Sequence, residues 1–454
     1  MPERISNLDA MFLYFDSKVA NMQVSTASIV EGIIDYERYV NQVSPRILAI
    51  PRLCQIPRFA RFHVRPPMWV EVDDFNPADH IEHVVLPNPG TDDQLRGVLS
   101  EIFHRSVDLT KPLWRICIVT RLAGGRSAMV FSFHHCLCDG SSAPLVFQAL
   151  YDPPEAGWPE HVQFKNAESN KSKDPPVPVR LAKALASRET RTKMRHFWRY
   201  LKAPAPWFPF TQPVSGRTHF SYRYIPLERF HEIRKQLGGT VTDVGLAAIG
   251  GALDRYAARE GIDVANQFFK VLLAQNVRPI EQYGEMGNAV SGIPTLVPLG
   301  IAEPAERLAR VTAYTRVAKE QRLGWFLHAL MIGIMDLVRP MGAAAIGRMM
   351  TSPKWLRFTR RLMRSPREHA IVTSVYSPSM AVQTIDGSEV TQVRPMVPCT
   401  LSLGLMCAIV SFGDRLQFAL SADKETLPKL ELLADDIEAV VGEMHACVQS
   451  SKMG

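Results

Sequence analysis

Two adjacent histidines end an apolar run in the stretch HHCLCDG, at residues 134–140. If residues 128–135 form a strand, successive side chains point to opposite faces, so His134 and His135 cannot share one role. We expect one imidazole to face the core and the other to face a cavity. Because a neutral imidazole can accept a proton from a hydroxyl group near pH 7, the cavity-facing histidine is a candidate general base.

The end of the same stretch has features of a structured turn. Asp139 follows His135 by four residues, and its carboxylate can hold the loop through an ion pair or by accepting backbone N–H groups. Gly140 permits a close approach or an unusual backbone angle before the helix expected over residues 141–150. Arg278, at the end of a predicted buried strand, is a candidate partner for Asp139, although a solvated arginine fits that position equally well.

Other chemistry for this stretch can be weighed from the sequence. A metal site would have histidine, cysteine and aspartate ligand atoms, but strand alternation separates them and no second cluster completes a tetrahedron. We therefore expect no metal and no bound cofactor. A purely structural role, with two core histidines and a turn aspartate, remains an alternative. The chain has neither the GxSxG elbow of serine hydrolases nor a GxxxxGK[ST] phosphate loop.

The elements that must position these residues indicate an α/β fold. Strand-like and helical patterns interleave along 454 residues, a length that exceeds one ordinary core. We expect an N-terminal domain over 1–160, a proline-rich linker and basic helix over 161–206, and a second domain over 207–454. In the second domain the pattern predicts a buried strand ending in QNV, a helix capped by Thr242 or Asp243, and a hairpin turning at Gly413-Asp414.

Positive charge is concentrated in two segments of the chain. Residues 180–202 carry a net charge of +7 and residues 339–367 carry +8, whereas the whole chain carries +7, so the remainder is about −8. Such blocks suggest an anionic partner, for which a membrane surface or a nucleotide-bearing molecule fits best. Nucleic acid is not expected, because neither zinc-finger spacing nor an RNP-type aromatic motif is present.

The second basic segment contains a predicted amphipathic helix, which Ser352 would cap. Its apolar face would hold an aromatic residue and aliphatic neighbours, and its other face would be basic, as expected for an interfacial anchor. Packing of the apolar face on the second domain is an equally good interpretation. The expected apolar positions are Trp355, Leu356, Thr359, Leu362 and Met363, and the basic ones are Lys354, Arg357, Arg360, Arg361 and Arg364.

Compartment signals in the sequence indicate the cytoplasm. The seven cysteines are scattered, with no CxxC pair, as expected for a reducing environment. We predict neither a signal peptide at the acidic N-terminus nor a transmembrane helix, since the longest apolar run, 324–335, is well short of ~20 residues.

Residues 134–140 match the HHxxxDG signature of the CoA-dependent acyltransferase superfamily, and other segments narrow the resemblance. ISNLDAMFLYFDS (5–17), the Pro112-Leu113-Trp114 triplet, Gly287-Asn288 and SFGDRLQFALSADKETLP (411–428) are similar to segments of the bacterial wax ester synthase/diacylglycerol acyltransferase family. The likeness covers nearly the whole chain. Trp114 itself is expected to pack in the core rather than to contact a ligand.

The resemblance implies both a fold and an activity. It implies two chloramphenicol-acetyltransferase-like α/β domains, with the reaction channel between them. It also implies that His135 is the general base, that His134 supports it and that Asp139 is mainly structural. Acyl-CoA would donate a long acyl chain directly to the hydroxyl of diacylglycerol or a fatty alcohol, and the enzyme would lie peripherally on the inner membrane or on lipid inclusions.

This chain departs from the family pattern at two candidate substrate or oxyanion positions. Thr242 precedes Asp243 where relatives carry asparagine, and it donates through a hydroxyl instead of an amide. Ser374 also replaces an asparagine; Arg278 and Asn288 complete this candidate set. Two alternatives therefore stay open: a catalytically impaired, lipid-binding or inclusion-coating homologue, and an HHxxxDG acyltransferase acting on another hydroxylated lipid or a sugar.

Overall fold

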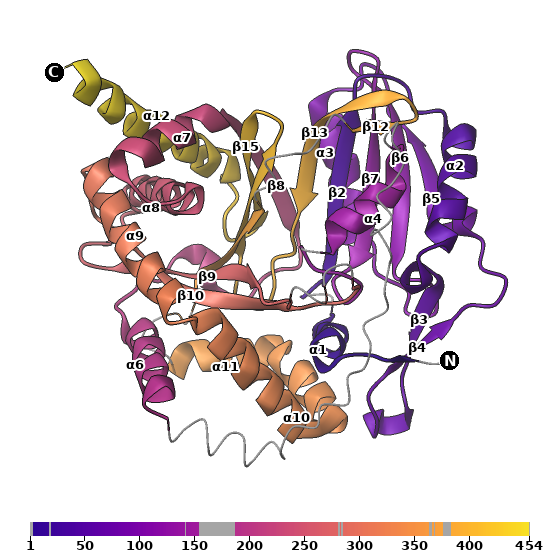
Figure 1. Cartoon of the computed structure of the whole chain (residues 1–454), viewed down its shortest axis with the longest axis horizontal. Helices are drawn as coiled ribbons and strands as arrows, with labels where there is room; N and C mark the ends of the chain where they lie inside the picture. The colour runs from indigo at the N-terminus through magenta and orange to yellow at the C-terminus, as the bar shows by residue number, and fades with distance from the viewer. Residues whose placement is uncertain are drawn as a thin grey trace.

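The chain folds into two mixed halves that lie side by side, each built on a six-stranded sheet, in a computed structural model (Figure 1). The structure describes residues 3–17, 20–140, 142–153, 187–279, 282, 285–362, 366, 368–375 and 383–453. The expected α/β class, with two chloramphenicol-acetyltransferase-like halves, is confirmed.

The N-terminal half is a sheet with helices on it, in the strand order β12-β13-β2-β7-β6-β5. Its strands are β2 (Gln23–Val30), β5 (Ile81–Val85), β6 (Trp114–Leu122), β7 (Arg126–His134), β12 (Thr384–Ile385) and β13 (Ser388–Met396). Its helices are α1 (Asn7–Phe15), α2 (Tyr36–Leu48), α3 (Asp92–His104) and α4 (Ala143–Leu150), with short turns η1 (Pro51–Cys54), η2 (Arg61–His63) and η3 (Pro77–His80). A small sheet adds β1 (Glu3–Arg4), β3 (Gln55–Arg58) and β4 (Met68–Glu71).

Strand β13 crosses from the second half of the sequence into the N-terminal sheet, where it pairs antiparallel with β2. In Figure 1 it is the orange arrow beside the indigo strands. Apolar residues at Val390 and Met396 are buried there, so the strand contributes to the N-terminal core. The domain boundaries expected from the sequence assign this strand to the second domain, whereas its pairing places it in the first sheet.

The C-terminal half has the strand order β10-β9-β11-β14-β15-β8. Its strands are β8 (Thr218–Pro226), β9 (Phe268–Asn276), β10 (Val290–Pro298), β11 (Ala370–Val375), β14 (Leu405–Phe412) and β15 (Arg415–Asp423). Its helices are α6 (Arg188–Lys202), α7 (Leu227–Leu237), α8 (Val241–Glu260), α9 (Pro304–Glu320), α10 (Leu323–Met350), α11 (Pro353–Leu362) and α12 (Leu430–Met453), and η4 is Pro209–Thr211.

Several expected elements of this half are confirmed, and one start is corrected. The strand ending in QNV is β9, and β14 and β15 form the hairpin, with Gly413 at φ +57° in its turn. Helix α8 is capped by Thr240 rather than by Thr242 or Asp243. The Thr240 side chain accepts the Asp243 N–H, and the Asp243 carboxylate accepts the Thr240 N–H, a capping box that satisfies two helix-end donors.

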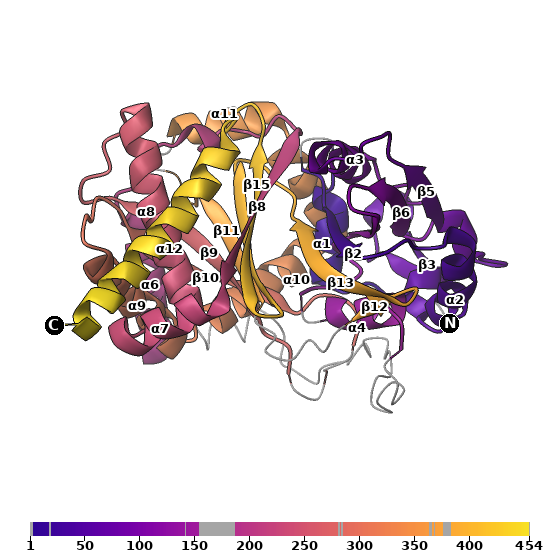
Figure 2. The same ribbon diagram turned by 90° about the horizontal axis from the view of Figure 1, so that it is seen from above.

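Away from the histidine turn, contacts at two places help to join the halves. Helix α3 lies against β8, where Phe103 and Phe220 meet edge to face and the Thr218 N–H donates to His104 Nε2. Helix α1 packs along α10, and Gly347 of α10 lies so close to Tyr14 that a Cβ there would stand 2.5 Å from its carbonyl oxygen. The edge of the N-terminal sheet that carries β13 faces the C-terminal half (Figure 2).

Helices α6, α10 and α11 gather with η2 at one end of the molecule, the lower edge of Figure 1, which we call the α10 end. Among the residues described, no helix combines the length and the apolar character needed to cross a bilayer.

Candidate active site

Strand β7 ends at His134, and His135 is the first residue after it. Backbone hydrogen bonds to the neighbouring chain segments continue through both histidines. The His134 N–H donates to the Leu113 carbonyl, and the His135 N–H donates to the Met22 carbonyl. His134 is fully buried, whereas His135 keeps partial exposure, so the two imidazoles have different surroundings. That His135 faces a cavity stays a prediction.

His134 has a supporting position beneath the site. Its Nδ1 accepts the Cys136 N–H at 3.2 Å, which holds the turn after the strand, and its Nε2 lies 3.9 Å from the Asp16 carboxylate. Burial, with a smaller effect from His135, lowers the pKa of His134 to about 3. His134 is therefore neutral at pH 7.

The His135 ring is held between an aromatic ring and an amide. Phe12 of α1 stacks on it with centroids 4.3 Å apart and planes 7° from parallel. Asn288 places its Oδ1 3.1 Å from His135 Nδ1. Burial lowers the pKa of His135, while a hydrogen bond of the ring with its own backbone, the Asp139 charge and the Asn288 contact act in the opposite direction. A lowered pKa keeps the imidazole neutral at pH 7, the form that accepts a proton.

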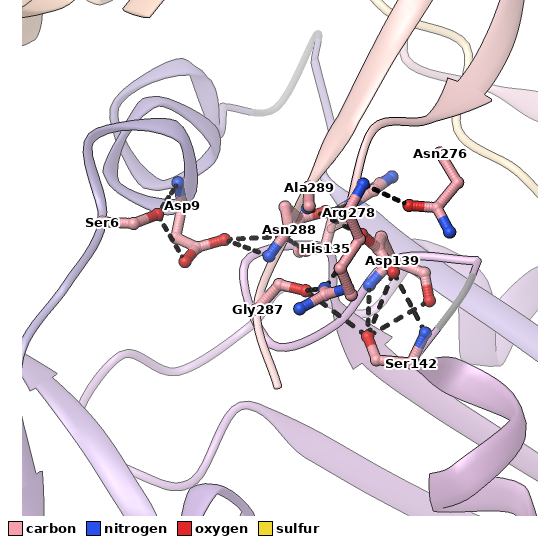
Figure 3. A network of polar contacts seen from close by, with 10 residues as sticks. All are labelled: Ser6, Asp9, His135, Asp139, Ser142, Asn276, Arg278, Gly287, Asn288 and Ala289. Carbon is pink, nitrogen blue, oxygen red and sulfur yellow. Dashed lines mark hydrogen bonds and ion pairs between the residues drawn. The ribbon is translucent and has the colours of Figure 1, made fainter. Parts of the chain in front are cut away.

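The segment between β9 and β10 brings C-terminal residues to the histidines. The Gly287 N–H donates to the Leu137 carbonyl at 2.9 Å, and Gly287 forms a bridge with Cys138. Asn288 Nδ2 donates to the His135 carbonyl at 2.7 Å. Figure 3 shows this segment beside the HHxxxDG turn. The site is therefore assembled from both halves of the chain.

Asp139 and Arg278 form a buried ion pair, the partnership that the sequence left open. Arg278 Nη2 lies 3.2 Å from Asp139 Oδ2, and the same nitrogen donates to the Gly287 carbonyl at 2.8 Å. Asp139 Oδ2 also accepts the Ala289 N–H at 2.7 Å, while Oδ1 accepts the Ser142 N–H at 3.0 Å. The carboxylate thus ties its own turn to the segment from the other half, as Figure 3 shows.

Asp9 of α1 is the residue that the sequence interpretation missed. Its Oδ1 accepts both the backbone N–H of Asn288, at 3.0 Å, and the Asn288 Nδ2–H, at 2.7 Å, while Ser6 Oγ lies 2.6 Å from Oδ2. Burial raises the pKa of the Asp9 carboxyl to about 6, and hydrogen bonds from Ser6 and Asn288 oppose that rise. The segment ISNLDAMFLYFDS carried the resemblance, but nothing in its spacing assigns Asp9 a partner.

The two hydroxyl residues that depart from the family pattern contact each other. Thr242 Oγ1 and Ser374 Oγ are 3.0 Å apart, between the first turn of α8 and β11. Next to Ser374, Val375 lies close to the HHxxxDG turn, since a Cβ on Gly140 would stand 3.9 Å from its Cγ2. Asp243 does not join this pair, because its carboxylate caps α8 and accepts from Thr315 Oγ1. A substrate or oxyanion role for these residues stays a prediction.

The Pro112-Leu113-Trp114 triplet belongs to the packing around the site. Trp114 is buried and donates its Nε1–H to the Leu53 carbonyl at 2.7 Å, and Leu113 is buried beside it. Both side chains belong to the buried cluster of the N-terminal half. Within the part of the chain that the structure describes, no group of three or more histidine, cysteine and acidic side chains is placed to hold a metal ion.

Comparisons with known proteins cover both halves. Residues 5–245 match the wax ester synthase/diacylglycerol acyltransferase catalytic domain, and residues 286–445 match the C-terminal domain of the same family. A probable diacylglycerol O-acyltransferase of Mycobacterium tuberculosis is 24% identical over 464 residues, which cover 99% of this chain and 97% of the relative.

Solved structures share the fold at low identity. The wax ester synthase/diacylglycerol acyltransferase from Marinobacter aquaeolei superposes with a TM-score of 0.67 at 19% identity, covering 98% of this chain and all of the other. The starter condensation domain of rhizomide synthetase, in complex with C8-CoA and Leu-SNAC, gives a TM-score of 0.60 at 14% identity, covering 99% and 94%. With its two matching domains, this chain belongs to the wax ester synthase/diacylglycerol acyltransferase family and is an acyltransferase.

Proposed function

We propose that the protein transfers a long acyl chain from acyl-CoA to the hydroxyl group of a lipid, diacylglycerol or a fatty alcohol, with His135 as general base. One observation carries the proposal: a neutral, partly exposed imidazole stands where the turn after β7 meets the β9–β10 segment of the other half. A positioned base of this kind is what a hydroxyl nucleophile requires.

The reaction needs one proton acceptor and no covalent enzyme intermediate. His135 takes the hydroxyl proton as the oxygen attacks the thioester carbonyl carbon, and a tetrahedral oxyanion forms. When that intermediate collapses, the carbon–sulfur bond breaks and the leaving thiolate takes the proton from the imidazolium. Donors placed at the oxyanion would stabilise it by several kcal/mol; the Thr242–Ser374 pair is our candidate source.

The donor and acceptor classes are supported by relatives rather than by contacts. The rhizomide synthetase domain of similar fold binds C8-CoA, and the Mycobacterium relative is named as a diacylglycerol O-acyltransferase. Acyl-CoA would serve as substrate, with no bound cofactor. Because Thr242 and Ser374 replace asparagines of the family pattern, two alternatives stay open. The acceptor is another hydroxylated lipid or a sugar, or the protein is an impaired homologue that binds lipid without transferring acyl groups.

A thiol-release assay on the purified chain separates these possibilities. We expect free CoA thiol to appear when palmitoyl-CoA is offered with dioleoylglycerol or hexadecanol, and the product to be triacylglycerol or wax ester by thin-layer chromatography. Without an acceptor, release should fall to background, because no acyl-enzyme is formed. Thiol release with palmitoyl-CoA and a sugar, but not with either lipid, would assign the sugar as acceptor. Binding of dioleoylglycerol and hexadecanol without thiol release would favour the impaired homologue.

We infer that the enzyme meets its lipid substrates through the α10 end, as a cytoplasmic protein held peripherally on the inner membrane or on lipid inclusions. Large apolar side chains are exposed there beside basic ones: Phe62 is 70% exposed, Trp198 53% and Phe358 53%. The exposed basic residues of η2, α6, α10 and α11 at the same end are Arg61, Arg188, Arg191, Arg195, Arg199, Lys202, Arg348, Lys354, Arg357 and Arg361. Apolar anchors with basic neighbours suit an anionic lipid surface.

Helix α11 is present where the sequence predicts an amphipathic helix. The residues that it exposes differ from those expected. Leu356 is buried and Trp355 half-buried, so the apolar face packs inward in part, while Phe358 stands exposed between Arg357 and the next basic positions. Of the predicted residues, Met363 and Arg364, the side chains of Thr359, Arg360 and Leu362, and residues 180–186 and 367 of the basic segments lie outside those described.

Vesicle flotation tests this surface. The parent should float with phosphatidylglycerol-containing vesicles at low salt, and Lys354→Gln/Arg357→Gln/Arg361→Gln should weaken binding by at least about 10-fold, at ~1 kcal/mol for each basic residue near the surface. High salt should weaken the parent too. The matched control is Arg229→Gln/Arg234→Gln/Lys235→Gln on exposed positions of α7, away from the α10 end, which should float like the parent. Equal flotation of the α11 variant would remove α11 as an anchor.

A further inference from the structure

The side-chain amide of Asn288 makes contacts that define which end is oxygen and which is nitrogen. Nδ2 lies 2.7 Å from the His135 carbonyl oxygen and 2.7 Å from Asp9 Oδ1. A backbone carbonyl can only accept, and Asp9 Oδ1 already accepts the Asn288 backbone N–H at 3.0 Å. If the amide were flipped, its oxygen would face two acceptors, so the orientation with Nδ2 toward them is the one that satisfies every group.

This orientation indicates where His135 carries its proton, beside the hydrogen bond that the ring makes with its own backbone. With Nδ2 directed at Asp9 and the His135 carbonyl, Oδ1 is the atom that lies 3.1 Å from His135 Nδ1. An amide oxygen only accepts, so Nδ1 must be the donor and must hold the hydrogen. In a neutral imidazole the other nitrogen then carries the lone pair. Nε2 is therefore the nitrogen left to accept a proton.

Asp9 is placed to hold the amide in this orientation. It is buried on α1, the Ser6 hydroxyl contacts its other oxygen, and two Asn288 donors converge on Oδ1. The approach of the carboxylate depends on Gly287, where φ is +92° and a Cβ would stand 3.0 Å from Asp9 Oδ2. Three separate parts of the chain thus meet around one imidazole (Figure 3).

We propose that Asp9 and Asn288 are positioning residues that set the tautomer of His135: Asp9 orients the Asn288 amide, and the amide oxygen holds Nδ1–H so that Nε2 is the base. This inference rests on the proposed role of His135 as general base. It adds a device that the motif does not contain, because Asp9 and Asn288 stand outside HHxxxDG. The Nε2–H tautomer would present a hydrogen to the substrate hydroxyl and could not take its proton.

The tautomer can be observed directly by nitrogen NMR of protein labelled at histidine with ¹⁵N, where the His135 signals are identified by their loss in His135→Ala. We expect the parent to show Nδ1–H and an unprotonated Nε2 at pH 7.5. Asn288→Ala should shift His135 toward Nε2–H, and should lower kcat roughly 10- to 100-fold, within the ~10² to 10⁴ that a positioned base supplies, while KM changes little.

Two variants at Asp9 separate the accepting oxygen from the charge. Asp9→Ala removes the acceptor, and kcat should fall about 2- to 10-fold, the kinetic equivalent of one net hydrogen bond. Asp9→Asn keeps an oxygen that can accept from Asn288, so it should restore most of the parental kcat and tautomer. Asn76→Ala, at an asparagine that caps η3, is the matched control and should leave His135 and kcat unchanged.

The NMR measurement needs no substrate, so it tests the tautomer inference independently of the proposed function. If every acceptor gave no thiol release, the tautomer measurement would still decide the inference. An unaltered Nδ1–H signal together with parental kcat in Asn288→Ala would overturn it, as would an Nε2–H parent. Should Asn288→Ala fail to fold, as judged by its thermal melt, Asn288→Ser, whose hydroxyl is too short to reach Nδ1, takes its place with the same two outcomes.

Discussion

His135→Ala is expected to fold like the parent and to lose nearly all acyl transfer, a fall of ~10² to 10⁴-fold in kcat, because it removes the only proton acceptor assigned to the substrate hydroxyl. The side chain is partly exposed, and its backbone N–H still donates to the Met22 carbonyl, so the sheet edge should survive. Initial rates of thiol release at saturating palmitoyl-CoA measure the loss, and a thermal melt checks the fold.

A histidine elsewhere gives the matched control. His445 on α12 pairs with Glu232 of α7, and His445→Ala should leave thiol release at the parental rate. Substrate binding should be largely kept in His135→Ala, because Phe12 and Asn288 remain to line the place of the ring. Full activity in His135→Ala would remove the proposed mechanism, whatever the stability of the variant.

The sequence was sufficient to identify the proposed general base, because the pattern that points to it is local. Alternation along β7 separates His134 from His135, and Asp139 and Gly140 follow within one turn, so the motif and its strand could be predicted together. The hairpin at Gly413-Asp414 is local in the same way, since its two-residue turn joins two apolar strands. Short-range geometry of this kind is set by backbone periodicity and turn residues.

The supporting residues could not be predicted, because their partners are distant in sequence. Asp9 and Asn288 stand 279 positions apart, and only the packing of α1 beside the β9–β10 segment brings them together. Strand β13 likewise meets β2 across more than half of the chain, and no periodicity in either strand names the other. The start of α8 is a different case: Thr240 and Asp243 have capping-box spacing, which could have identified Thr240 as the cap.

The Asp139–Arg278 pair leads to the largest expected effect on stability. Both side chains are buried, so replacing one leaves the other charge without its partner, at a cost of about 3 to 5 kcal/mol. Asp139→Ala also removes the acceptor for the Ser142 and Ala289 N–H groups, each worth ~1 to 3 kcal/mol when left unsatisfied. We expect a clearly lower melting temperature for Asp139→Ala and a milder decrease for Asp139→Asn, which keeps the shape and one accepting oxygen.

Because the Asp139–Arg278 pair joins the two halves of the site, its loss should lower the rate of acyl transfer as well as the melting temperature. Arg278 also holds the Gly287 carbonyl, so in Asp139→Ala the segment that carries Asn288 loses two of its anchors and thiol release should fall with stability. Glu306→Ala, which breaks the exposed Glu306–Arg310 pair on α9, is the control; exposed pairs contribute about 0 to 1 kcal/mol, so it should melt with the parent. Differential scanning calorimetry of the parent, Asp139→Asn, Asp139→Ala and Glu306→Ala measures the melting temperatures. Equal melting temperatures for the parent and both Asp139 variants would contradict a structural role for Asp139. Its carboxylate would then be a candidate for a direct role in the reaction.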